Sequence, residues 1–219
     1  MQDATCLTDK RKYSGKESEL WTPCIYDFFC RCTPILPVST CTRPAPKNSA
    51  PWYTSRNSLK IEGDMYIEPG PNQFMYKIAE TFDRKLINDP SRFTQKGDIT
   101  GIYPDIVVIL PNRQGVLVIE NKPYGDGSTF DGNQGPGGAY VDFVKWLIRK
   151  GIHCEYLVIM PISWNAGYGD VVQLRKDLEN DFGVLLLEDI FAAMSKHNFK
   201  YERVSENWRD FSDKGGDYA

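Results

Sequence analysis

Residues 103–122, YPDIVVILPNRQGVLVIENK, decide how this chain folds. Two apolar runs, 106–110 and 116–119, flank a short polar segment that ends in Gly115, and both runs are rich in the β-branched residues that suit strands. This pattern predicts a β-hairpin. Neither run alternates apolar with polar residues, so both faces of each strand should be covered, as in the middle of a sheet with helices on both sides.

Charged residues stand at the open end of this hairpin. If the loop centres on Asn112 and Arg113, the register places Asp105 opposite Glu120. Directly opposed side chains have Cβ atoms about 4.5–5.5 Å apart and point to the same side of the sheet. Lys122 shares that face because side chains alternate along a strand. A loop of three or five residues would instead shift the register by one.

Two carboxylates and an ammonium group on a mostly buried sheet require an explanation. Adjacent carboxylates repel each other, which raises the pKa of one of them unless a cation lies between them. Mg²⁺ is typically held by one or two carboxylates together with waters and substrate phosphate. Lys122 would then orient or deprotonate an attacking water, or stabilise charge on the phosphate. The alternative is a structural ion pair in which Lys122 bridges both acids.

Pro104-Asp105, followed by Glu120-Asn121-Lys122 at the end of the next strand, resembles the signature of the PD-(D/E)XK nuclease superfamily. Members of this family use Mg²⁺, which Mn²⁺ can replace, to hydrolyse phosphodiester bonds in nucleic acids. The resemblance implies that Asp105 and Glu120 ligate the metal and that the main-chain carbonyl of Asn121 completes the shell. It also implies a role for Lys122 at the water or phosphate, and a restriction-endonuclease-like α/β fold with a mixed central sheet flanked by helices.

A further acid could come from the helix predicted by the apolar spacing over 74–86. In the superfamily the first core helix often adds an acidic residue to the metal site. Glu80, at the border of the apolar stripe, is the best-placed match, and Glu68 and Asp83 are substitutes. The alternative is that Glu80 is an ordinary solvated surface residue.

A second amphipathic helix is predicted over 140–148, between the strand at 116–119 and a buried strand at 154–160. This order predicts a parallel crossover. Many relatives carry a Gln-x-x-x-Tyr element on this helix that positions substrate. Gln134 and Tyr140 are the candidates here, although they are too far apart for that pattern and Tyr140 fits a core position equally. Further elements are a strand at 65–67, a helix at 171–178, a strand at 183–187 and a helix at 188–197.

Residues 1–58 are interpreted as a basic, Cys- and Pro-rich N-terminal extension without regular periodicity, and residues 59–219 as the nuclease-like domain. The first 60 residues hold nine Lys and Arg against five acids, although the net charge of the chain is −3. This segment is therefore either a phosphate-contacting arm or a solvated basic surface. Five of the six cysteines also fall here, but no CxxC pair is present, so structural Zn²⁺ is a weaker interpretation than unliganded thiols.

These features together predict an intracellular Mg²⁺-dependent nuclease, with DNA as substrate and internal cleavage as the mode. No apolar run resembles a signal peptide or a membrane span, so no membrane partner is expected. A homodimer that cuts both strands is compatible with the sequence, as is RNA as substrate. Two alternatives remain: a catalytically inactive nuclease-fold module that binds nucleic acid or protein, and a protein recognised by a partner through residues 1–55.

Overall fold

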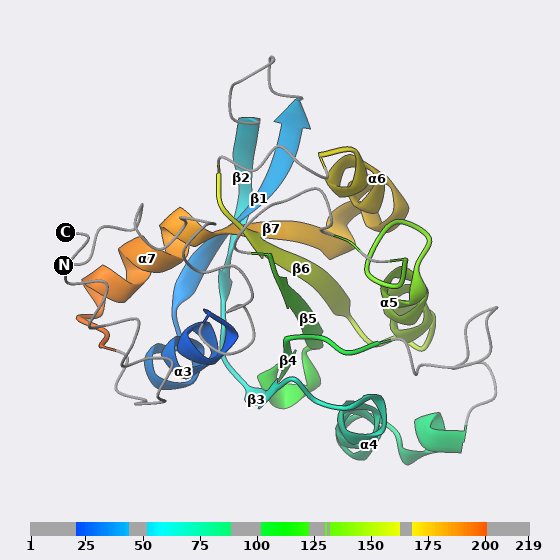
Figure 1. The fold of residues 1–219 in the computed structure, drawn as a ribbon. Helices are drawn as coiled ribbons and strands as arrows, with labels where there is room; N and C mark the ends of the chain where they lie inside the picture. Colours follow the sequence, from blue (N-terminus) through cyan, green and yellow to red (C-terminus); the bar gives the residue numbers. More distant parts are fainter. Residues whose placement is uncertain are drawn as a thin grey trace.

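The computed structural model describes residues 21–43, 52–88, 102–122, 130, 132–162 and 168–200. These residues form an α/β protein with an open, mixed sheet of seven strands and five α-helices (Figure 1). The strands lie in the order β2-β1-β7-β6-β5-β4-β3. They are β1 (Ile35–Arg43), β2 (Trp52–Lys60), β3 (Asp64–Ile67), β4 (Ile106–Ile109), β5 (Val116–Asn121), β6 (Cys154–Met160) and β7 (Phe182–Leu186). The helices are α3 (Thr22–Cys32), α4 (Pro71–Thr81), α5 (Ala139–Arg149), α6 (Tyr168–Leu178) and α7 (Leu187–Lys196).

The predicted hairpin is confirmed as β4 and β5, which pair antiparallel. Ile106 lies opposite Ile119 and Ile109 lies opposite Val116, which is the expected register. The connection contains a short 3₁₀ turn, Pro111–Arg113, in which Asn112 has the positive φ of 55°. Every residue of both strands is buried, as the uninterrupted apolar runs predict.

Helices cover both faces of the sheet. Figure 1 shows α4, α5 and α6 on one side and α3 and α7 on the other. On the first side, Phe74 and Phe143 pack in one apolar cluster with Val118 of β5. On the second side, Phe28 and Ile190 pack with Leu117 and Ile119 of β5, among others. Because side chains alternate along a strand, the even-numbered residues of β5, Glu120 included, face α4, α5 and α6.

The remaining elements of the domain follow the predicted order. β5 and β6 are parallel, as are β6 and β7, with α5 and α6 as the intervening helices. The expected helices over 140–148, 171–178 and 188–197 are confirmed to within a few residues. The helix expected over 74–86 ends at Thr81 and is followed by a 3₁₀ segment, Arg84–Asn88. None of the helices in the described ranges has the length and apolarity needed to cross a bilayer.

The expectation of an irregular N-terminal extension needs correction, because residues 22–60 supply α3 and two strands of the same sheet. A boundary at residue 58 would fall inside β2. Three local features explain why the sequence pattern does not indicate these elements. Pro23 stands in the first turn of α3, where a missing N–H is tolerated. Pro37 lies inside β1, and β2 is a polar edge strand without clear apolar alternation.

Candidate active site

The structure brings together Asp105, Glu120 and Lys122. Asp105 directly precedes β4, Glu120 is near the end of β5, and Lys122 follows that strand. The main-chain N–H of Asn121 donates a hydrogen bond to Asp105 Oδ2 at 2.6 Å. Lys122 Nζ lies 3.5 Å from Glu120 Oε2. The ends of the two strands therefore bring two carboxyl groups and an ammonium group close together, on the face covered by α4 and α5.

Burial dominates the electrostatics of this group. Glu120 is 1% exposed, and the pKa of its carboxyl group is raised well above its usual range by burial and then by the charge of Asp105. Lys122 acts in the opposite direction on the pKa of Glu120. Burial also raises the pKa of Asp105, and the hydrogen bond from the Asn121 N–H opposes this shift. Each of the two carboxyl groups therefore lies in surroundings that disfavour its ionised form.

Two buried side-chain oxygens at the end of β5 have no hydrogen-bond partner within the described residues, Glu120 Oε1 and Asn121 Oδ1. The Asn121 side chain points to the opposite face, toward Thr22, so Glu120 Oε1 is the one that belongs to the group of Asp105 and Lys122. Buried polar atoms are nearly always paired, so this oxygen requires a partner that the described protein groups do not supply, such as a water or an ion. Its chemistry suits a hard cation, because carboxylate oxygens are the ligands that Mg²⁺ prefers. The donor set present therefore fits Mg²⁺.

The protein supplies few ligands to such an ion. In the described ranges no group of three or more His, Cys, Asp or Glu side chains lies close enough to hold a metal. Asp105 and Glu120 would be the two carboxylates, which is the usual number for Mg²⁺ when waters and substrate oxygens complete the shell. The main-chain carbonyl of Asn121 belongs to the same strand end. The Asn121 side chain is on the opposite face, where its Nδ2 donates to Thr22 Oγ1 of α3 at 3.3 Å.

Glu80 is not brought to this group in the described structure. It lies on the exposed side of α4, and its Oε2 is 3.3 Å from Lys77 Nζ, one turn earlier. Phe74 and Ile78 occupy the buried stripe of that helix instead. The neighbouring substitute Asp83 accepts a hydrogen bond from the Lys85 N–H at 2.9 Å, which is a local turn contact.

Glu68 is the additional acid that approaches the site. Its main-chain N–H donates to the Asp105 carbonyl at 2.8 Å. The pKa of Glu68 is raised by burial and then by the charge of Asp105, so the two carboxyl groups sense each other. Its position follows from the pairing of β3 with β4, in which Ile67 lies opposite Ile106, so that the next residue, Glu68, reaches Asp105. The sequence carries no local signal for this pairing.

Tyr140 is both a core residue and a neighbour of the site. Its ring is 1% exposed, and its hydroxyl oxygen accepts a hydrogen bond from the Tyr103 N–H at 3.0 Å. The hydroxyl group also lies against the Glu120 carboxyl and lowers the pKa of that acid. Gln134 is placed differently, since its main-chain carbonyl accepts a hydrogen bond from the Tyr156 hydroxyl at 3.1 Å. Of the two candidate residues, Tyr140 therefore lies beside Glu120, whereas Gln134 contacts Tyr156.

The cysteines concentrated in the N-terminal part of the sequence are spread over different elements. Cys24, Cys30 and Cys32 lie on α3, whereas Cys41 lies on β1. Burial raises the pKa of the Cys24 thiol to about 12, which keeps it protonated at neutral pH. The described cysteines form no disulfide and no zinc-binding group. Cys6 and the basic residues before residue 21 lie outside the described residues.

The arrangement can hold a divalent cation against two carboxylates, with a cationic side chain beside it. Two ionised carboxylates carry one more negative charge than Lys122 offsets. A divalent cation would reverse this balance to a net positive charge, which would attract an anionic substrate. No protein-family model, curated protein or solved structure matches this chain.

Proposed function

We propose that this chain is a Mg²⁺-dependent nuclease that hydrolyses phosphodiester bonds, with DNA as its substrate and internal cleavage as its mode. In this proposal the chain is a member of the PD-(D/E)XK superfamily, and its mixed sheet is of the restriction-endonuclease-like kind. The observation that carries the proposal is the unpaired buried oxygen Glu120 Oε1 on a carboxyl group that interacts with both Asp105 and Lys122.

A purely structural ion pair explains these contacts less well. Lys122 approaches Glu120 through Oε2, and Oε1 stays without a hydrogen-bond partner in the described residues. A buried ion pair offsets its desolvation cost only when further hydrogen bonds satisfy the remaining lone pairs. With both acids ionised, one ammonium group also cannot neutralise both carboxylates. A site that is completed by a cation accounts for both facts.

The protein groups have distinct tasks in the proposed reaction. The Asn121 N–H holds the Asp105 carboxylate, and Tyr140 supports Glu120 from the side of α5. Asp105 and Glu120 would hold Mg²⁺, which would supply Lewis acidity and lower the pKa of a bound water. Lys122, whose side chain is 13% exposed, can donate hydrogen bonds to a phosphate oxygen or orient the attacking water. Lys122 is therefore the one of the three charged residues that we assign to direct contact with substrate.

The test is a cleavage assay with matched variants. Supercoiled plasmid, linear duplex DNA, single-stranded DNA and RNA are incubated with Mg²⁺ or Mn²⁺, beside an EDTA control. We expect metal-dependent cutting of DNA by the wild type and its loss in Glu120→Gln, which keeps the shape of the side chain. Glu62→Gln is the control, because this side chain is 45% exposed and pairs only with Lys60, at 2.6 Å, in the described structure.

The products separate the possible modes. Nicked or linear plasmid indicates internal cleavage, whereas degradation of linear DNA alone indicates cleavage from ends. Full metal-dependent activity in Glu120→Gln would refute the assignment of the site. No cutting of any substrate by the wild type, together with no Mg²⁺ binding in calorimetry, would refute the nuclease and favour a binding module with the same fold.

A further inference from the structure

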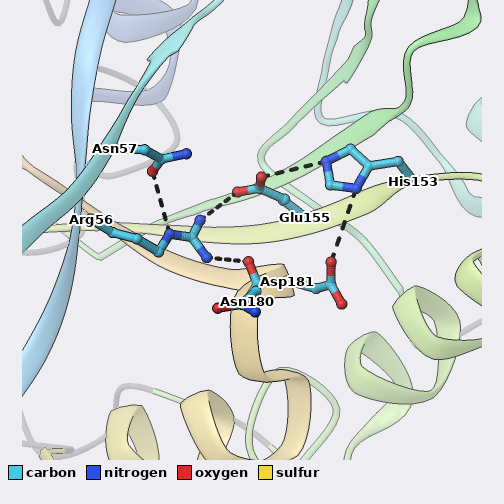
Figure 2. Close-up of polar contacts among 6 residues, drawn as sticks. All are labelled: Arg56, Asn57, His153, Glu155, Asn180 and Asp181. Carbon is cyan, nitrogen blue, oxygen red and sulfur yellow. Dashed lines mark hydrogen bonds and ion pairs between the residues drawn. The ribbon is translucent and has the colours of Figure 1, made fainter.

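A second polar cluster lies away from the candidate active site, around the start of β6 (Figure 2). Arg56 of β2 reaches across to this strand, and its Nη2 is 2.9 Å from Glu155 Oε2. Its Nη1 donates to the carbonyl oxygen of Asn180, and its Nε donates to Asn57 Oδ1 at 3.3 Å. Glu155 lies opposite Leu117, three residues before the position opposite Glu120, which is about 10 Å along the strand. The two clusters are therefore separate sites.

Arg56 also forms part of the wall of a hollow between β1, β2 and α6. The hollow has a volume of about 530 Å³, and the polar residues that line it are Thr40, Arg56, Arg175, Lys176, Glu179 and Asn180. This volume is within the range of pockets that bind small molecules, about 300–1,000 Å³. Three of the six polar side chains are cationic and only one is acidic.

One of these three positive charges is left uncompensated by the acids at the hollow. Glu155 offsets the charge of Arg56, and Glu179 supplies one further negative charge in the wall. Arg175 is held through Nη1 by the main-chain carbonyl of Cys41 at 3.0 Å, a neutral partner that fixes the guanidinium group without neutralising it. Lys176 is exposed and forms no ion pair within the described residues. The hollow keeps an excess positive charge in a chain whose net charge is −3.

We infer that this hollow binds a phosphate-bearing anion. Guanidinium groups present a planar array of donors that matches phosphate oxygens, and each Arg here is oriented in advance by a carbonyl group. Lys176 adds a mobile point charge at the rim. The ligand is either a small free phosphate compound of nucleotide size or one phosphate of a nucleic-acid backbone, and the chemistry of recognition is the same for both. This inference does not rest on the proposed nuclease activity.

Binding is measured on the full chain in EDTA, so that hydrolysis plays no part. Pyrophosphate is titrated by calorimetry, and a short fluorescein-labelled DNA duplex by fluorescence anisotropy. The variants are Lys176→Gln and Arg175→Gln, alone and together, which leave the Arg56–Glu155 contact intact. The control is Lys196→Gln, because Lys196 is an exposed lysine in the last turn of α7, as Lys176 is in α6. Thermal unfolding of each variant checks the fold.

We expect pyrophosphate affinity to fall about tenfold in Lys176→Gln, further in the double variant, and not in Lys196→Gln. If the DNA affinity falls in parallel, and its salt dependence decreases by about one unit of slope, the bound phosphate belongs to a nucleic acid. If the DNA affinity is unchanged, the ligand is a small free anion. The inference is overturned if pyrophosphate does not bind saturably, or if Lys196→Gln weakens binding as much as Lys176→Gln. Failure of nuclease activity in the cleavage assay would leave these results unaffected.

Discussion

Replacing Glu120 with Gln should stabilise the metal-free protein while removing its response to Mg²⁺. Glu120 is 1% exposed, and one of its oxygens has no hydrogen-bond partner in the described residues. Gln has nearly the same shape but no charge, so it avoids the desolvation cost and the repulsion from Asp105. Replacing a whole buried ion pair by neutral groups of similar volume is often stabilising by about 1–4 kcal/mol, whereas removing one partner of an isolated pair is destabilising. Because Lys122 keeps Asp105 as a counter-charge in the variant, we expect a stabilisation at the low end, about 1–2 kcal/mol.

The effect of pH on this difference has a definite sign. The pKa of Glu120 in the folded state is raised above its ordinary value of 4.5 by burial and by Asp105. The folded state therefore binds this proton more tightly than the unfolded state, and the wild type loses stability as pH rises from about 4.5 through the folded-state pKa. Gln does not titrate. The advantage of the variant should be absent at low pH and reach its full size at high pH.

The assay is thermal unfolding in EDTA and in Mg²⁺ at several pH values. For a chain of this size, 1 kcal/mol corresponds to about 2–4 °C in Tm, so Glu120→Gln should unfold about 2–8 °C above the wild type in EDTA at pH 8. Saturating Mg²⁺ should raise the Tm of the wild type, since a ligand at 100 times its Kd adds about 2.7 kcal/mol. Glu62→Gln should behave as wild type. Equal Tm values for wild type and Glu120→Gln in EDTA at pH 8, with equal Mg²⁺ responses, would refute the argument.

Three further predictions concern the site and its support. Lys122→Gln should reduce the cleavage rate at least about 100-fold while Mg²⁺ binding, measured by calorimetry, persists, since this side chain acts on the substrate and not on the metal; loss of Mg²⁺ binding would contradict the assignment. Tyr140→Phe should lower the free energy of unfolding by about 1–2 kcal/mol in chemical denaturation, because the Tyr103 N–H loses its acceptor; an unchanged value would show that this hydrogen bond contributes nothing. Gly183→Ala should destabilise by about 1–3 kcal/mol, because the added Cβ would lie 2.3 Å from a methyl group of Val38 where β1 pairs with β7. Gly169→Ala is its control, with no atom within 4 Å of the added Cβ; equal unfolding free energies in the two variants would contradict the packing argument.

The central hairpin could be predicted because residues that are close together in the sequence determine it. The two apolar runs are separated by a short loop, and the loop length alone fixes which residues lie opposite each other. Asp105 and Glu120 then follow from the register without any knowledge of the rest of the chain. Burial on both faces was predictable for the same reason, since neither run contains a polar residue.

The N-terminal elements could not be recognised from local patterns. β1 pairs with β2 over a full strand length but with β7 through Ser39 and Val184, so its partners are distant in the sequence. β2 is an edge strand with no buried residue, and its polar sequence carries no strand signal. The role of α3 depends on Ile25 and Phe28 packing against β5, some 90 residues later. Such contacts come from tertiary structure, which local propensity does not encode.

The same division explains why the sequence favours Glu80 over Glu68 as an additional acid. Its position on a predicted helix points to Glu80, but that helix buries Phe74 and Ile78 and turns Glu80 to solvent beside Lys77. Glu68 instead follows β3, and the register of β3 on β4 continues to place it opposite Asp105, as the register of β4 on β5 places Asp105 opposite Glu120. Its φ of 42° shows that the chain leaves the strand there, although its N–H still bonds to the Asp105 carbonyl. Three acids thus lie at successive strand ends, and strand pairing, not helical periodicity, is the pattern that groups them.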